Sequence, residues 1–347
     1  MSTVSTEPLA TTEPQPSPRS AITSPARAWG AYAVGIVLLV LLLLLVQGKD
    51  YWLNIVTLAF LFAAAASAWN IIGGFGGQLS FGHGVFFAVG AYSVAILYGK
   101  HGISPWLCLL IGIPVAMAVA AITSAPIFRL RGPFFSMATL ALNQVALVLA
   151  VYFASFTGGA QGVAMPFKPS TANLTFVNRV NYGIVSLVLL AIVVAVALWV
   201  SRSRLGYALR AVREDDQSAA AAGFGIFRTK MTGMLLSGAL TSVAGGLYAV
   251  YIHYVDPESV LNLGDVGVRF VLIALLGGIG TVSGPVVGAL VLIPLVYQLQ
   301  GLLAGARPGV NLAVVGLLIV LIPLAFRGGI VGSVTKAWGA MQRRRAR

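Results

Sequence analysis

The chain has 347 residues, of which 58% are hydrophobic and only 9% are charged, and its mean hydropathy is +0.92. So few charges cannot cover the surface of a water-soluble domain of this length, so the composition predicts an integral membrane protein. The net charge of +13 would suit a nucleic-acid-binding protein. In a membrane protein, however, excess Lys and Arg indicates cytoplasmic loops, and we expect no nucleic-acid partner. The single cysteine, Cys108, excludes a disulfide within the chain.

The N-terminal residues 1–28 are rich in Pro, Ser and Thr and hold almost no large apolar side chains. Such a segment cannot form a core, so we expect a disordered cytosolic tail rather than a signal peptide. Residues 29–327 form the predicted transmembrane domain, and residues 328–347 a basic cytosolic tail.

Apolar stretches near the length of about 20 residues that crosses a bilayer recur along the chain. They are 30–46, 54–72, 80–98, 105–127, 135–155, 182–200, 231–251, 267–281, 284–300 and 310–326. Two are weak as independent spans, because 80–98 opens with LSFGHG and 267–281 is short and ends in GGIGTVSG. The predicted fold is therefore an all-α polytopic integral membrane protein with about ten transmembrane or partly re-entrant helices.

Lys and Arg divide unequally between the two sides of these spans. The poorer side holds six of the 22, namely Lys49, Lys100, Lys168, Arg179, Arg269 and Arg307. The positive-inside rule assigns the richer side to the cytosol, together with both termini and residues 202–230.

The charged segment GYALRAVREDDQSAAAAGFGIFRTK occupies residues 206–230 between two apolar runs. Good helix formers continue from Tyr207 through Ala222, with glycines on either side, so we expect one short cytosolic helix. Its alanines would let another protein approach closely. The alternative is a solvated connector helix.

The source of energy is constrained by two absences in the sequence. The chain lacks the phosphate-binding G-x-x-x-x-G-K-[ST] pattern, so we do not expect it to hydrolyse nucleotide itself. It also has no visible arrangement of a nucleophile with a base, so we expect no enzymatic activity and no cofactor. All nine acidic residues fall in loops, tails or span ends. Ion-coupled carriers usually keep ionisable groups at mid-membrane, which disfavours that class. The classes that remain are a passive pore and a permease that is driven from outside through its loops.

Five motifs carry a family resemblance. LSFGHGVFFAVGAYSVAIL (79–97), RGPFFSMATLALNQV (131–145), TGGAQGV (157–163), the segment 202–230 and GGIGTVSGPVVGALV (277–291) follow one another at characteristic spacing. In this order they resemble the LivM-type inner-membrane permease subunit of branched-chain amino-acid ABC importers. The resemblance extends from about residue 50 to 326.

The resemblance implies a transport subunit of a bacterial-type inner membrane, in contact with lipid, that forms half of a translocation path. Its partners would be a homologous second permease, two cytosolic ATPase subunits and a periplasmic or extracellular substrate-binding protein. The solute would be a branched-chain amino acid or a related small polar solute such as urea, an amide or another amino acid. An ion-coupled secondary carrier of a small solute is the alternative.

The resemblance also implies that the segment 206–225 couples the permease to its ATPase. The matching coupling residues are Arg213, Glu214, Asp215, Ala219, Ala220, Ala221 and Gly223. Gln217 departs from the general importer pattern, which has Glu six residues before this glycine.

Six polar residues within or beside the spans are candidates for lining the path: Asn70, Gln78, Ser80, His83, Asn143 and Gln144. Each is also a candidate for an interhelical hydrogen bond worth about 1 kcal/mol. For His83, the favoured interpretation is a ring satisfied by backbone carbonyls in a tight bend. The G-x-x-x-G pairs at 73 and 77, 280 and 284, and 284 and 288 predict close helix packing. His101 and His253 lack partners at ligand spacing, so no metal site is expected.

Overall fold

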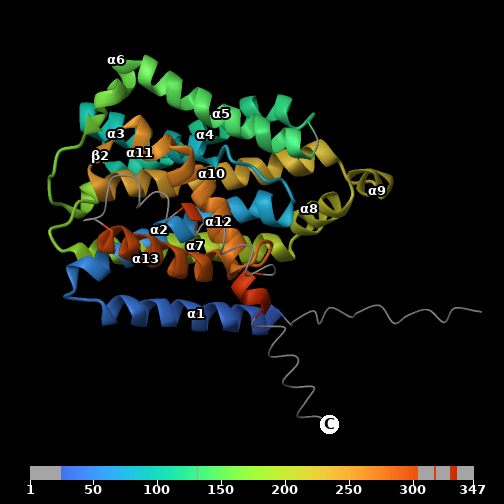
Figure 1. Ribbon diagram of the computed structural model, residues 1–347, viewed down its shortest axis with the longest axis horizontal. Helices are drawn as coiled ribbons and strands as arrows, with labels where there is room; N and C mark the ends of the chain where they lie inside the picture. Colours follow the sequence, from blue (N-terminus) through green and yellow to red (C-terminus); the bar gives the residue numbers. More distant parts are fainter. Residues whose placement is uncertain (1–24, 131, 304–315, 318–328, 334–347) are drawn as a thin grey trace, which may run out of the picture.

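A computed structural model describes residues 25–130, 132–303, 316–317 and 329–333, and these residues are almost entirely helical (Figure 1). The elements in chain order are α1 (Pro25–Leu45), α2 (Asp50–Asn70), η1 (Ile71–Phe75), α3 (His83–His101), α4 (Pro105–Ile127), α5 (Pro133–Tyr152), α6 (Ala154–Thr157), η2 (Gly159–Gln161), β1 (Val163–Ala164), η3 (Thr171–Asn173), α7 (Arg179–Arg202), α8 (Arg204–Glu214), α9 (Asp216–Ala221), α10 (Ile226–Ile252), β2 (Tyr254–Val255), α11 (Pro257–Leu261), η4 (Leu263–Gly267), α12 (Val268–Gly277) and α13 (Gly284–Leu302).

Within the described residues, seven helical stretches are long and apolar enough to cross a membrane. They are Ala28–Leu45, Asp50–Phe75, Pro105–Ile127, Pro133–Tyr152, Arg179–Arg202, Ile226–Ile252 and Gly284–Leu302. Each coincides with one of the predicted apolar segments, which confirms the all-α polytopic membrane fold. The expected tails and the segment 310–326 lie almost wholly outside the described residues.

The two weak segments differ from full spans in different ways. The first forms α3, which begins only at His83 because the chain before it bends through 76–82. The second forms α12, whose 10 residues extend about 15 Å, half the thickness of a hydrocarbon core. The short α11 and the π-helical η4 precede it. The segment 267–281 is therefore too short to be an independent span, as its sequence indicates.

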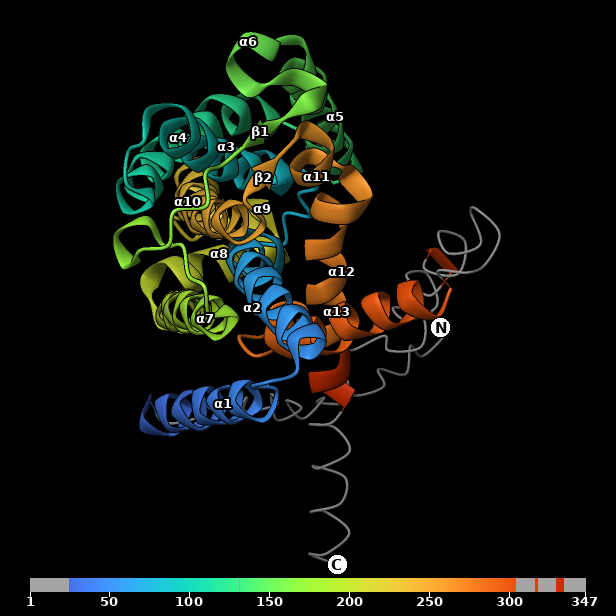
Figure 2. The same cartoon turned by 90° about the vertical axis from the view of Figure 1, so that its left-hand side faces the viewer.

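The helix α2 forms the centre of the molecule. Every residue from Ile55 to Asn70 is buried, and α7, α10, α12 and α13 pack around it (Figure 2). A helix that is apolar on all sides can be buried in this way, and the four alanines at 63–66 let its neighbours approach closely.

The crossing of α3 with α10 brings the two backbones into direct contact. A Cβ atom on Gly90 would lie 1.8 Å from the carbonyl oxygen of Ser242, and one on Gly245 would lie 1.9 Å from that of Phe87. Only hydrogen fits at either position, as in small-residue helix crossings generally.

The predicted G-x-x-x-G contacts are partly correct. A Cβ atom on Gly288 would lie 1.9 Å from the carbonyl oxygen of Ile273, which confirms close packing of α13 against α12. The pair at 73 and 77 forms no helix crossing, because Gly77 has φ +66° and turns the chain after α2.

The molecule has two different ends along its helix axes (Figure 1). The short helices α8 and α9 project at one end, and the other holds α6, α11 and the antiparallel pair of β1 with β2. The chain reverses at these ends, so Arg202, Arg213 and Arg228 lie at the α8–α9 end, whereas Lys49, Lys100 and Arg179 lie at the opposite end. The basic residues that the sequence predicts on opposite sides of the membrane thus lie at opposite ends of the described helices. Which end faces the cytosol stays a prediction.

Apolar side chains cover much of the outer surface of α1, α4 and α5. In Figure 2, α1 lies beside α7 at one edge, and α5 lies at another. Exposed examples are Leu38, Leu45, Leu110, Ile122, Phe134, Met137 and Tyr152. Apolar surfaces of this extent suit contact with lipid or with another membrane subunit.

Candidate coupling segment and translocation path

The candidate coupling segment consists of two helices rather than one. The chain is extended at Asp215, with φ −160°, so α8 ends and α9 begins there. The Asp215 carboxylate accepts a hydrogen bond of 2.6 Å from the backbone N–H of Ser218, and this bond lowers the pKa of Asp215. The expectation of a single helix from Tyr207 through Ala222 was wrong, because an aspartate N-cap competes with helix continuation.

The first of these helices is anchored by its apolar face. Leu209 and Val212 are buried, and Leu209 joins a core cluster with Ile72 of η1 and Met234 of α10. Ser203 caps the helix by accepting a hydrogen bond of 3.4 Å from the backbone N–H of Gly206. The α8 helix is thus fixed to the transmembrane core.

The side chain of Arg213 links α8 to two other elements. Its Nη1 donates a hydrogen bond of 2.7 Å to the carbonyl oxygen of Gly74 in η1. Gly77 and Gly280 lie directly against it, since their Cβ atoms would stand 2.7 Å from Cγ and 2.8 Å from Nη1. Arg213 therefore connects the candidate coupling segment to the end of α2 and to the turn 278–283.

The alanines of α9 do not share one environment. Ala219 is buried, whereas Ala220, Ala221 and Gly223 are exposed, as are Glu214 and Asp215. The helix is held against α10 by an ion pair in which Lys230 Nζ lies 2.8 Å from Asp216 Oδ2. The side chain of Lys230 is only 8% exposed and that of Asp216 is 27% exposed, so the pair lies at the edge of the interior.

The path candidates Ser80 and His83 lie together in a buried network. Ser237 of α10 donates its hydroxyl proton to the carbonyl oxygen of Ala68, at 2.7 Å, so its oxygen is left to accept from His83 Nε2, at 2.8 Å. His83 Nδ1 then accepts from the Ser80 hydroxyl at 3.1 Å. The ring is satisfied as expected, but by two hydroxyls and not by backbone carbonyls. The network joins α2, α3 and α10.

Asn70 holds the turn that follows α12. Its Nδ2 donates to the carbonyl oxygen of Thr281 at 2.8 Å, and its Oδ1 accepts from the backbone N–H of Gly280 at 2.9 Å. Both polar atoms are thus used within the protein.

Asn143 lies in the middle of α5 and is fully buried. Its Nδ2 donates to the carbonyl oxygen of Leu261 at 2.6 Å, and its Oδ1 has no partner among the described residues. Gly84 packs directly against this oxygen. Of the remaining candidates, Gln78 is bonded to the nearby Gly76 carbonyl oxygen, and Gln144 is exposed. The six candidates therefore do not form one site.

A polar pocket in the half of the molecule opposite α8 and α9 was missed in the sequence analysis. Its lining residues come from α2, α10, α11, η4, α12 and α13, so no local motif marks it. They are Phe62, Tyr248, Asp256, Glu258, Ser259, Asp265, Arg269, Val296, Tyr297 and Gln300. We call it the outer pocket. The sequence analysis counted Arg269 only among the charges on the poorer side of the spans.

The chain was compared with known proteins. A family profile described as "Branched-chain amino acid transport system / permease component" matches residues 51–323. The high-affinity branched-chain amino acid transport system permease protein LivM of Escherichia coli (strain K12) is 27% identical over 303 residues, covering 75% of this chain and 71% of the relative. LivH of the same organism is 25% identical over 258 residues, covering 69% and 82%.

A more distant relative has a different printed function. The nucleoside ABC transporter permease protein NupC of Lactococcus lactis subsp. cremoris is 28% identical over 188 residues, covering 50% of this chain and 59% of the relative. No solved structure matches. Because the family profile covers most of the chain, the chain belongs to the permease components of branched-chain amino acid transport systems.

Proposed function

We propose that this permease is one half of the membrane channel of an ATP-driven importer for branched-chain amino acids or a related small polar solute. Its partners are a homologous second permease, two cytosolic ATPase subunits and an external substrate-binding protein. The relatives that bear the names LivM and LivH support this assignment. The α8–α9 end then faces the cytosol of a bacterial-type inner membrane, in agreement with its excess of basic residues.

The observation that carries the proposal is the construction of the α8–α9 segment. It projects from the body at one end, yet Arg213 bonds it to η1, and Asp216 bonds it to α10 through Lys230. A solvated connector needs no such attachment. A segment that receives force from an ATPase needs this attachment, because the force has to be transmitted to the transmembrane helices.

The contact surface of the segment is formed by its exposed residues. Ala220, Ala221 and Gly223 lack long side chains, so a groove on the ATPase can approach the backbone, while Glu214 and Asp215 set its orientation by charge. Ala219 is buried, so it packs beneath this surface and is not part of it.

A large side chain at Ala220 or Ala221 tests the proposal. Ala220→Trp and Ala221→Trp place the ring in solvent in the isolated chain, so insertion and abundance should be normal. Overpacking a close interface costs about 1–3 kcal/mol, so ATPase co-purification and solute uptake should fall. Gln217→Ala is the matched control, because Gln217 is exposed on the same short helix. Tryptophan variants that assemble, hydrolyse ATP and transport like the parent would show that the segment is an ordinary connector.

A further inference from the structure

The outer pocket has the size and composition of a small-molecule site. Its volume is about 390 Å³, which lies in the range of pockets that hold small ligands. Charged groups stand beside apolar and aromatic ones in its wall, and six separate elements contribute to it.

One cation is held in a fixed position in this pocket. The Arg269 guanidinium carbon lies 5.1 Å from the centre of the Phe62 ring, and Nη2 donates a hydrogen bond of 2.5 Å to Asp265 Oδ1. The Arg269 side chain is 16% exposed, whereas that of Asp265 is 62% exposed. Among the described residues, none accepts a hydrogen bond from the other two guanidinium nitrogens. The second N–H of Nη2 also has no acceptor among the described residues, so it can join Nε or Nη1 in the paired contacts that arginine makes with carboxylates.

Two further carboxylates stand in the wall of the pocket. Asp256 uses Oδ2 to cap α11 through the backbone N–H of Ser259, at 3.2 Å, and no described group donates to its Oδ1. Glu258 is exposed, and its Oε1 accepts a hydrogen bond of 2.5 Å from Asn262. With Asp265, the wall holds three carboxylates and one guanidinium, so its net charge disfavours anions and favours a solute that carries an ammonium group.

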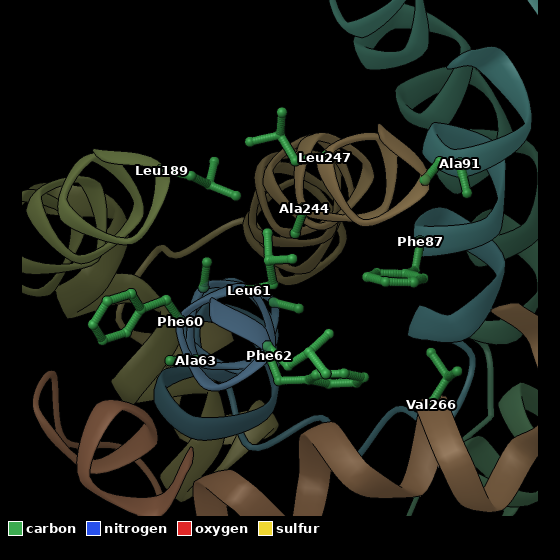
Figure 3. Packing of buried hydrophobic residues seen from close by; sticks show 14 of the residues in the cluster. Phe60, Leu61, Phe62, Ala63, Phe87, Ala91, Leu189, Ala244, Leu247 and Val266 are labelled. Atoms are coloured by element: carbon green, nitrogen blue, oxygen red, sulfur yellow. The ribbon is translucent and has the colours of Figure 1, made fainter. Parts of the chain in front are cut away.

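The floor of the pocket is apolar. Phe62 and Val296 are buried, and the Phe62 ring lies 6.2 Å from that of Tyr248 and 6.3 Å from that of Phe87. Figure 3 shows Phe62 of α2 and Phe87 of α3 pointing toward one another beside Val266. An aliphatic side chain placed on this floor would be removed from water while its charged end remained at the wall.

We infer that the outer pocket is a solute site within the permease and that it binds the zwitterionic end of an aliphatic α-amino acid. Arg269 binds the carboxylate, Asp256 and Glu258 bind the ammonium, and Phe62 with Val296 contacts the side chain. The inference rests on the proposed importer function for its physiological role and adds a location and residue roles to it. Urea carries no opposite charges and gains less from this arrangement than an amino acid.

Protection of a single cysteine measures binding directly. Gln300→Cys, in a Cys108→Ser background, places the only thiol of this chain on the wall of the outer pocket, and labelling is followed on this subunit. With the purified full-length complex, millimolar L-leucine should slow maleimide labelling at least about threefold, the protection expected when the ligand reaches twice its Kd. The two controls are 4-methylpentanoate, which lacks the ammonium, and 3-methylbutylamine, which lacks the carboxylate. The first should protect least, because the wall disfavours anions, and the second should protect less than leucine, because it leaves Arg269 without its carboxylate.

Removal of the cation should have a matching effect. Arg269→Gln should abolish the protection and lower leucine uptake about tenfold at equal complex abundance. Arg269→Lys should retain part of both, because lysine keeps the positive charge but cannot make the two parallel hydrogen bonds of a guanidinium. Arg179→Gln is the matched control. Arg179 lies in the same half of the molecule, is 61% exposed and meets Asp50 only at 4.0 Å.

The outcomes separate the site from the importer function. Protection by leucine but not by its fragments supports the site even if ATP-driven uptake is absent, and in that case the proposed function fails alone. Normal uptake that is unchanged in Arg269→Gln, together with equal labelling in the presence and absence of leucine, overturns the site and leaves the function standing. Equal protection by 3-methylbutylamine would overturn the role of Arg269 as the carboxylate ligand.

Discussion

Arg213 is the residue whose replacement should uncouple ATP hydrolysis from transport. Arg213→Gln keeps part of the side-chain stem but removes the charged hydrogen bond to the Gly74 carbonyl oxygen. Hydrogen bonds to charged groups contribute about 1.5–3 kcal/mol. Arg213 is largely exposed, so we reduce this to about 1 kcal/mol, since solvent screens exposed charges. One kcal/mol corresponds to about a fivefold change in an equilibrium constant.

The effect should appear in the ratio of solute imported to ATP hydrolysed. The ATPase contacts proposed for Ala220 and Ala221 remain intact, so hydrolysis should continue, while the link from α8 to η1 and to the turn 278–283 is weakened. We expect the ratio to fall about fivefold in proteoliposomes that contain the complete complex. Gly280→Ala should act in the same direction, because a Cβ atom there would lie 2.8 Å from Arg213 Nη1 and the backbone has φ +76°.

Arg210→Gln provides the control for charge. Arg210 donates to the carbonyl oxygen of Ser201 at 2.7 Å and stacks over the ring of Tyr207, so its contacts stay within the α7–α8 corner. Arg210→Gln should therefore leave the ratio of solute imported to ATP hydrolysed near that of the parent. Equal ratios for Arg213→Gln and the parent, at normal abundance, would refute a coupling role for Arg213.

Three other predictions concern orientation, stability and energy source. In a Cys108→Ser background, Val177→Cys should react with an impermeant thiol reagent added from outside and Gln217→Cys should not; the reverse pattern would invert the orientation. His83→Ala should leave the buried Ser80 hydroxyl without its acceptor and lower the free energy of unfolding by about 1–3 kcal/mol, seen as a lower melting temperature in detergent, whereas exposed His101→Ala should change it little. Uptake by the complete complex should persist when proton and sodium gradients are collapsed at constant ATP, and uptake that stops would favour an ion-coupled mechanism.

The membrane helices could be predicted from sequence because their signal is local. Length and apolarity alone identify seven of them, and the glycines of GGIGTVSG mark the short α12. The break at Asp215 could not be predicted in the same way. Residues on both sides favour a helix, and only the contacts of α8 with the core and of α9 with Lys230 decide where the chain turns.

The polar residues could be selected by type but not assigned by role. Asn70 and His83 stand out as polar groups among apolar ones, yet both partners of Asn70 and one of the two partners of His83 lie more than 150 residues away, in Gly280, Thr281 and Ser237. Arg269 was counted only among the charges on the poorer side of the spans, because nothing near it in sequence shows that Phe62 lies beneath it. Long-range convergence of this kind is set by the packing of whole helices.

The contact between α3 and α10 has a mechanical consequence. Glycines at 90 and 245 leave no layer of side chains between the two backbones, so there are no rotamers that could change to let one helix slide past the other. Hydrogen bonds that run from Ser80 through His83 to Ser237 and the carbonyl oxygen of Ala68 also connect these two helices to α2. We expect α2, α3 and α10 to move as a rigid frame, with bending confined to the junctions that lead out of it.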